Sequence, residues 1–346
     1  MSFIDRVLEA PSYGWERGGA LHVPSLRTLL RHTLSRLNVF RDRRNWVAFS
    51  SWFWSLAFAP FLIVFLTKYF SLPLLAVGLV YSMVVVGSHG TIWFHRYSTH
   101  RAYQFKHPWV RFAVENLVPK VIINELYTIS HHVHHARSEK PGDPYNAHGG
   151  FFYCFLADVN HQPIARNLDR RDYGKLQRLM SHTGVRTNSY EQYLRWGSLA
   201  RPLRTTLGFV VSWAFWYGAF YLVGGHALAT ALFGCTFLWA VGIRTFNYDG
   251  HGKGKDKRRE GYDLHRGDLS INQVWPGLVA GEWHNNHHLF PRSARTGFLP
   301  TQPDGAWLFI RCLEKLGLVH RVIDEKERFL ALHRERNAAL VEAPAA

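Results

Sequence analysis

Histidines are the residues whose types and spacing in this 346-residue sequence point most directly to chemistry. Of the 21 histidines, nine fall in four short groups. These groups are His95 and His100 in an HxxxxH pattern, His131, His134 and His135 in an HxxHH pattern, His251 in an NxxxH pattern that begins at Asn247, and His284, His287 and His288 in a second HxxHH pattern. Because imidazole is a ligand for iron, copper, nickel and zinc, the groups predict a metal centre.

The spacing within each group predicts which side chains share a face. On an α-helix, residues at i, i+3 and i+4 lie on one face, so each HxxHH pattern can aim three imidazoles at one point. Asn247 and His251 share a face for the same reason. His95 and His100 are five residues apart and point about 140° away from each other on a regular helix. Either the helix unwinds there, or the two histidines flank the site from different sides. His132 falls off the shared face and is interpreted as a neighbour of the ligands.

The number of histidines indicates two metal ions. Structural zinc takes four protein ligands, and catalytic zinc takes three plus a water, so nine histidines are too many for one ion. Two ions with four or five nitrogen ligands each fit better. Ligand type alone leaves the metal open, whereas oxidation of an inert substrate would favour iron.

Four apolar stretches without a charged residue lie beside these groups. They cover residues 46–66, 74–94, 206–223 and 227–243. Each is near the ~20 residues that a helix needs to cross a bilayer. The short breaks between them predict hairpins, because the backbone must satisfy its own hydrogen bonds in lipid. The expected fold is an all-α integral membrane protein, with four transmembrane helices in two hairpins and a helical cytoplasmic cap that holds a dimetal site.

The charge distribution predicts the orientation in the membrane. Of the 41 Lys and Arg residues, only Lys68 lies in a predicted outer loop. The positive-inside rule therefore places both termini and the metal site in the cytoplasm. The formal net charge of +16 predicts contacts with anionic membrane lipids and with acidic partners, and no nucleic-acid partner is expected. The expected domains are a cytoplasmic segment (1–45), a membrane domain (46–295), and a C-terminal amphipathic helix with its tail (296–346).

Three segments carry a resemblance to a known family. They are HRYSTHRAYQF from His95, HHVHHARSEKPGDPYN from His131, and GEWHNNHHLFP from Gly281. Together with the NxxxH pattern they resemble the membrane fatty acid desaturases, most closely the Δ9 type that acts on acyl-CoA or acyl lipids. The resemblance implies two irons on the nine histidines, with Asn247 completing one site through a water. It also implies O₂ as co-substrate and a fatty acyl chain, carried by CoA, a carrier protein or a lipid, in a narrow tunnel beside the irons.

The same resemblance implies a separate electron donor. The His-Pro-Gly-Gly signature of a fused b-type cytochrome domain does not occur in the sequence. Electrons are therefore expected from a ferredoxin, or from a b-type cytochrome with its reductase.

Helical periodicity selects one face for the expected tunnel. In a helix, residues set back from His95 by multiples of about four stay roughly on its side. This selects the substrate-binding candidates Leu79, Met83, Gly87 and Thr91.

Two other functions remain open at the level of the sequence. A related diiron hydroxylase, or an enzyme that releases a terminal alkene from a fatty acid, would use the same site. A histidine-rich metal transporter or sensor is a more remote alternative, because it predicts charged residues inside the spans. The four apolar stretches contain no Asp, Glu, Lys or Arg.

Overall fold

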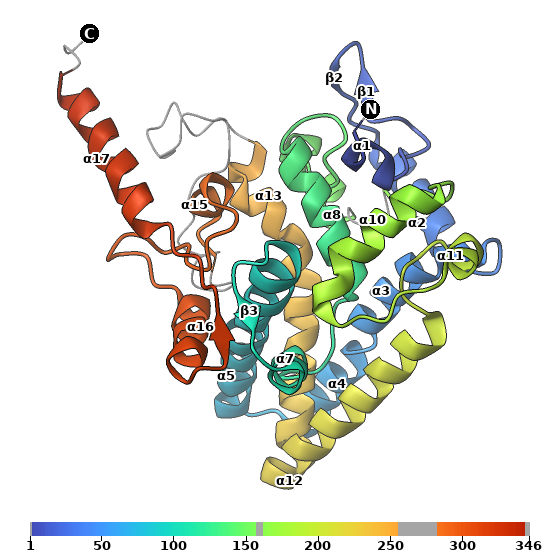
Figure 1. Ribbon diagram of the computed structural model, residues 1–346. Coiled ribbons are helices and arrows are strands. Elements are labelled where there is room, and N and C mark those ends of the chain that lie inside the picture. Colours follow the sequence, from blue (N-terminus) through green and yellow to red (C-terminus); the bar gives the residue numbers. More distant parts are fainter. Residues whose placement is uncertain (1, 157–161, 255–281, 343–346) are drawn as a thin grey trace.

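The computed structural model describes residues 2–156, 162–254 and 282–342, and within these ranges the chain is mostly helical (Figure 1). Short antiparallel strand pairs occur twice among these residues, β1 with β2 and β3 with β4. The elements before residue 100 are α1 (Ile4–Val7), β1 (Glu16–Arg17), β2 (Ala20–Leu21), α2 (Leu26–Leu37), η1 (Arg43–Asn45), α3 (Trp46–Leu56), α4 (Ala59–Val64), η2 (Phe65–Tyr69), α5 (Leu72–Val80), η3 (Tyr81–Val86), α6 (Gly87–His89) and η4 (Gly90–Thr99).

The remaining elements follow residue 100 and include the last long helical run. They are β3 (Gln104–Phe105), α7 (Pro108–Glu115), α8 (Asn124–Arg137), η5 (Ala147–Gly149), α9 (Phe151–Phe155), α10 (Arg170–Met180), η7 (Ser181–Thr183), α11 (Tyr190–Trp196), α12 (Pro202–Gly242), η8 (Ile243–Thr245), α13 (Phe246–Gly250), η9 (Gly252–Gly254), α15 (His284–Leu289), α16 (Gly305–Lys315), β4 (Val319–His320) and α17 (Lys326–Glu342).

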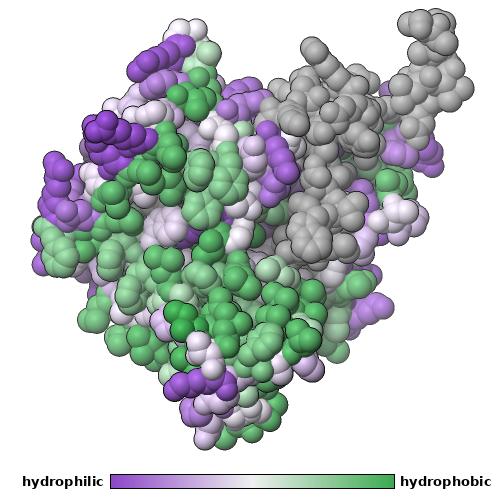
Figure 2. All heavy atoms as spheres, turned by 180° about the vertical axis from the view of Figure 1, so that it is seen from behind, coloured by the Kyte–Doolittle hydropathy of each residue, from purple (hydrophilic) through white to green (hydrophobic). Residues whose placement is uncertain are grey.

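Among the described residues, three helical runs are long and apolar enough to cross a membrane: Arg43–Tyr69, Leu72–Thr99 and Pro202–Gly250. The first two are separated where the Ser71 hydroxyl accepts a hydrogen bond from the Leu74 amide and so caps the start of α5. Apolar residues gather over the lower part of the surface, and hydrophilic residues lie mainly toward the upper part (Figure 2). Many large apolar side chains on these runs are exposed, as expected for helices that face lipid.

The third long run reverses direction in its middle. Gly224 and Gly225 depart from helical geometry, and Gly225 has a φ of 62°, which glycine adopts without strain. The ring centroids of Tyr217 and Phe233 lie 5.6 Å apart, although 16 residues of straight helix would separate them by about 24 Å. The chain therefore folds back on itself at the two glycines, and α12 forms the lower tip in Figure 1.

Small and aromatic side chains pack the long helices together. A Cβ at Gly78 in α5 would lie 2.9 Å from the Ala231 carbonyl oxygen of α12, so glycine permits this close approach. Phe58, Phe233 and Trp239 are buried in one cluster between the helices. The helices with the predicted metal ligands, η4, α8, α13 and α15, lie at the opposite end of the molecule from the tip of α12 (Figure 1).

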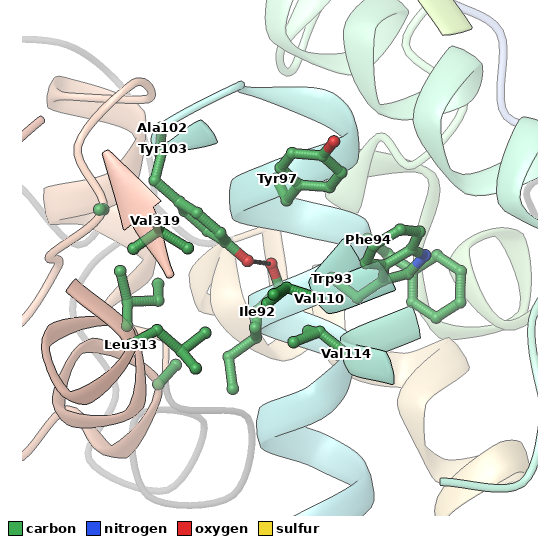
Figure 3. Packing of buried hydrophobic residues seen from close by; sticks show 13 residues of the cluster. Ile92, Trp93, Phe94, Tyr97, Ala102, Tyr103, Val110, Val114, Leu313 and Val319 are labelled. Atoms are coloured by element: carbon green, nitrogen blue, oxygen red, sulfur yellow. Dashed lines mark hydrogen bonds between the residues drawn. The ribbon is translucent and has the colours of Figure 1, made fainter. Parts of the chain in front are cut away.

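An amphipathic helix with a tail is expected within the C-terminal region, residues 296–346. This region contains two helices, α16 and α17, separated by β4. The first ends at Lys315, and Gly317 follows with a φ of 70°, a conformation that stops an α-helix at little cost for glycine. Leu313 of α16 and Val319 of β4 pack beside Ile92 of η4 and Tyr103, which fixes this region against the second long run (Figure 3).

Candidate metal centre

The structure brings all nine predicted histidines together in two neighbouring clusters. The five-histidine cluster contains His95, His100, His131, His135 and His287, and the four-histidine cluster contains His134, His251, His284 and His288. Within each cluster, one ring nitrogen of every member lies within 4.8 Å of those of all the others. His135 and His288 are half-buried and the other seven are buried.

Each HxxHH pattern serves both clusters, which corrects the expectation that its three imidazoles aim at one point. From α8, His131 and His135 enter the five-histidine cluster, and His134 enters the other. From α15, His284 and His288 enter the four-histidine cluster, and His287 the other. The physical reason is the helical period, because residues at i and i+4 lie about 40° apart whereas the residue at i+3 lies on the other side of i.

A π-helix explains how His95 and His100 reach the same cluster. The His100 amide donates to the His95 carbonyl at 3.1 Å, the i→i+5 bond of the π-helix η4. This wider turn places residues five apart on nearly the same side, and the two ring centroids lie 5.1 Å apart. Of the two expectations for this pair, the change in helical winding is the one that the structure contains.

Four imidazoles of the five-histidine cluster form a closed ring of nitrogen contacts. Their Nε2 atoms are separated by 2.8 Å (His95–His287), 2.8 Å (His287–His135), 3.1 Å (His135–His131) and 2.8 Å (His131–His95). A neutral imidazole nitrogen either donates one hydrogen or accepts, so hydrogen bonds cannot satisfy all four contacts. A metal ion held between the four rings would satisfy all four nitrogens, because each lone pair could then point toward the ion.

The four-histidine cluster forms an open chain of similar contacts. The Nε2 atom of His288 lies 3.3 Å from that of His134 and 3.2 Å from that of His284. The Nε2 atom of His284 lies 3.0 Å from that of His251. Nitrogens that bind one ion at about 2.0–2.1 Å lie roughly 2.8–3.4 Å apart, so the donor sets and separations of both clusters fit metal ions.

Burial favours the neutral form of several of these imidazoles, which is the form that metal binding requires. Burial, followed by the charge of neighbouring imidazoles, holds the pKa of His100 and His131 well below the usual range. The same causes lower the pKa of His284, His287 and His288. A neutral ring presents the lone pair that a metal ion needs.

Three carboxylates behind the histidines were missed from the sequence. The Nδ1 atom of His134 lies 2.8 Å from Asp143 Oδ1, and that of His251 lies 3.0 Å from Glu139 Oε1. The third carboxylate, Glu282, lies behind the five-histidine cluster. Metal-bound histidines commonly donate their second N–H to a carboxylate. That rule could have selected Glu139 and Asp143 from the segment directly after the first HxxHH pattern.

The NxxxH asparagine lies one turn before its histidine. The His251 amide donates to the Asn247 carbonyl at 3.1 Å. Asn247 Oδ1 is buried and has no hydrogen-bond partner in the part of the chain that the structure describes. Its role as a ligand through a water stays a prediction. His132 belongs to neither cluster among the described residues, with its ring centroid 6.3 Å from that of His100.

The winding near His95 differs from the α-helical period used to select the tunnel face. In the wider turn of the π-helix, both Gly90 and Thr91 lie about one turn before His95. A Cβ on Gly90 would lie 3.4 Å from the Trp239 ring. Farther along the same run, Met83 is half-buried against the aromatic cluster between the long helices. The role of Leu79, Met83, Gly87 and Thr91 in binding substrate stays a prediction.

The fold and the site together define a membrane-associated helical protein with a histidine-rich centre suited to two metal ions. The sequence profile named "Fatty acid desaturase" matches residues 71–297, which include all nine histidines. The chain belongs to the fatty acid desaturase family. It is therefore an oxidoreductase that desaturates fatty acyl chains, and the resemblance of the three histidine segments is confirmed.

Individual relatives agree with this family. The chain is 26% identical over 273 residues to an sn-1 stearoyl-lipid 9-desaturase of Anabaena variabilis, which covers 75% of this chain and 88% of the relative. It is 30% identical over 237 residues to an acyl-CoA C20 Delta5-desaturase of Anemone leveillei, with 66% and 67% covered. It is 28% identical over 324 residues to Delta-9 acyl-lipid desaturase 2 of Arabidopsis thaliana, with 85% and 89% covered.

Proposed function

We propose that this desaturase uses O₂ and a histidine-ligated diiron centre to introduce a double bond into a saturated fatty acyl chain. The observation that carries the proposal is the division of nine histidines into two neighbouring clusters with separations that suit metal ions. The relatives named for stearoyl-lipid and acyl-CoA substrates support a long acyl chain on a lipid or CoA carrier.

The residues that would hold the irons are the two clusters, with Asn247 beside the four-histidine cluster. Iron would supply the oxidising power that removal of hydrogen from an unactivated C–H bond requires. The protein orients the ligands, because Asp143 and Glu139 face the Nδ1 atoms of His134 and His251 and leave their Nε2 atoms toward the site. Tyr127 stacks on His131 with ring centroids 5.3 Å apart and helps to exclude water.

The proposed membrane arrangement has four spans in two hairpins. The reversal at Gly224 and Gly225 supports two spans within residues 202–250, in addition to those at 43–69 and 72–99. The distribution of Lys and Arg supports a cytoplasmic position for both termini and for the metal centre. The domains proposed are residues 1–45, 46–295 and 296–346.

The proposed acyl tunnel follows the second span, with Met83 as its testable member. Met83 lies half-buried beside the cluster that contains Val86, Phe233 and Trp239. Met83→Trp should shift preference to shorter acyl chains without changing iron content, because a packed channel cannot absorb another ring. An unchanged chain-length profile over a series of saturated substrates would mean that the tunnel follows another face.

The reaction is tested with purified, iron-loaded protein, a reductant with a ferredoxin or b-type cytochrome donor, and O₂. Deuterated acyl chains are supplied on a lipid, on CoA or on a carrier protein, and the products are analysed by mass spectrometry. The proposal predicts an O₂-dependent loss of two hydrogens from adjacent carbons. A hydroxylated chain, a terminal alkene with one carbon fewer, or turnover without O₂ would contradict it.

A further inference from the structure

One carboxylate contacts ligands from two different histidine groups. Glu282 Oε2 lies 3.2 Å from the Nδ1 atom of His95, and Glu282 Oε1 lies 3.7 Å from the Nδ1 atom of His287. The Nε2 atoms of the same two rings lie 2.8 Å from each other inside the five-histidine cluster. The side chain of Glu282 is 1% exposed, and this buried carboxylate lies close behind both ligand rings, although neither of its oxygens forms a hydrogen bond among the described residues.

A buried arginine lies on the other side of Glu282. The Nη2 atom of Arg96 is 3.9 Å from Glu282 Oε2, and it is 2.9 Å and 3.0 Å from the two carboxylate oxygens of Asp304. The Arg96 side chain is 1% exposed, and a charge so deeply buried must be matched by opposite charge and hydrogen bonds. Arg96 thus connects Glu282, which lies beside the ligands, with Asp304, which is 22 residues farther along the chain.

Asp304 is itself held rigidly by the backbone. Its Oδ1 atom accepts from the Trp307 amide at 2.8 Å and caps the start of α16. Its Oδ2 atom accepts from the amides of Thr296 at 2.8 Å and Gly297 at 3.1 Å. Asp304 therefore gives Arg96 a fixed anchor.

The packing of α16 extends this anchor to the helix that carries His95. Ile310 and Leu313 of α16 are buried in the same cluster as Ile92 and Trp93 of η4. Figure 3 shows Leu313 of α16 at one side of this cluster and Ile92 of the π-helix η4 facing it. The segment of the first histidine group and α16 are thus joined by apolar packing. They are also joined by the buried charged side chains of Glu282, Arg96 and Asp304.

We propose that Asp304 is a positioning residue for the five-histidine cluster. It fixes Arg96, Arg96 fixes Glu282, and Glu282 sets the rings of His95 and His287. The inference rests on the proposed two-metal centre and extends it to a residue outside all four histidine groups. Without the Asp304 charge, the Arg96 guanidinium shifts toward Glu282 and draws that carboxylate away from the two Nδ1 atoms.

The test is a Co²⁺ titration of the metal-free full chain, followed by absorption spectroscopy, with Asp304→Asn beside the wild type. Asparagine caps helices about as well as aspartate, so α16 should still begin normally. The wild type should bind two ions per chain. In the variant one site should be unchanged and the other weakened about 10- to 100-fold, the usual effect of removing an outer partner of a metal ligand.

Asp169→Asn is the matched control. Asp169 caps α10 by accepting from the Asp172 amide at 2.7 Å, so the same substitution there should leave both sites unchanged. If Asp304→Asn does not fold, Arg96→Lys keeps the charge, loses the two-oxygen contact, and should weaken the same site.

The outcomes separate this inference from the proposed function. A wild type that binds fewer than two ions refutes the two-metal centre and the inference with it. A wild type with two sites and a variant that binds both ions equally well refutes the role of Asp304 alone. Equal weakening of both sites together with a lower melting temperature would make Asp304 a structural residue only.

Discussion

The two histidine clusters share ligands from α8 and α15 but are closed differently. The five-histidine cluster has a ring of four nitrogen contacts, and His95 and His100 come from a helix continuous with the second long apolar run. The four-histidine cluster is an open chain, and two of its histidines are oriented by Asp143 and Glu139 from the loop after α8. The five-histidine cluster therefore has the more closed set of contacts between its ligands.

From this difference we expect different roles for the two proposed metal positions. Five protein nitrogens leave one ion little freedom to change its ligands. Four histidines leave more open positions, which oxygen-using iron sites require for O₂ or water. The two clusters are thus expected to respond differently to loss of a ligand, to chelation and to substitution of the carboxylates behind them.

The largest effect is expected from removing one ligand of either cluster. His287→Ala and His134→Ala should each reduce turnover below ~0.1% of wild type, because both ions act as one unit. Metal analysis should show the loss mainly of one ion in each variant, from the five- and the four-histidine cluster respectively. Near-normal turnover in His134→Ala would overturn the ligand assignment.

A chelator should remove the metal ions of the two clusters at different rates. With a moderate chelator, the ion of the four-histidine cluster should leave first, roughly tenfold faster, because it has fewer protein ligands and loop-borne outer partners. Metal content and absorption followed over time measure this. A single phase in which both ions leave together would remove the proposed asymmetry.

The carboxylates behind the histidines should act selectively, each on its own cluster. Glu282→Gln should weaken metal binding at the five-histidine cluster, and Asp143→Asn at the four-histidine cluster, each by roughly 10- to 100-fold. Glu191→Gln is the control, because its side chain is 64% exposed and forms an ion pair with Arg170. If both carboxylate variants affected the same site, the division into two clusters would need revision.

The smallest effect is expected at histidines outside both clusters. His132→Ala and His226→Ala should retain two ions and near wild-type turnover. His226 Nδ1 lies 2.9 Å from the Tyr217 hydroxyl near the reversal of α12, far along the chain from the ligands. Loss of one ion in His132→Ala would add that residue to the ligand set.

Much of the site could be predicted from the sequence because its ligands repeat at short intervals. The nine histidines, their membership in one centre, and the apolar stretches follow from local spacing and hydropathy. The break at Gly224 and Gly225 was equally visible, since two consecutive glycines interrupt an apolar run.

What the sequence did not reveal depends on backbone winding and on distant contacts. The π-helix that places His95 and His100 together has no marked residue pattern. The sharing of each HxxHH pattern between two clusters requires the positions of α8 and α15 in space. The contact of Arg96 with Asp304 joins residues 208 apart, so local spacing could not predict it.

The metal content of the full-length protein tests the central claim most directly. Protein purified from iron-replete cells should contain two Fe per chain by elemental analysis, with a Mössbauer spectrum that resolves two iron environments of different ligation. A single iron per chain, or zinc alone after iron-replete growth, would contradict a diiron centre formed by the two histidine clusters.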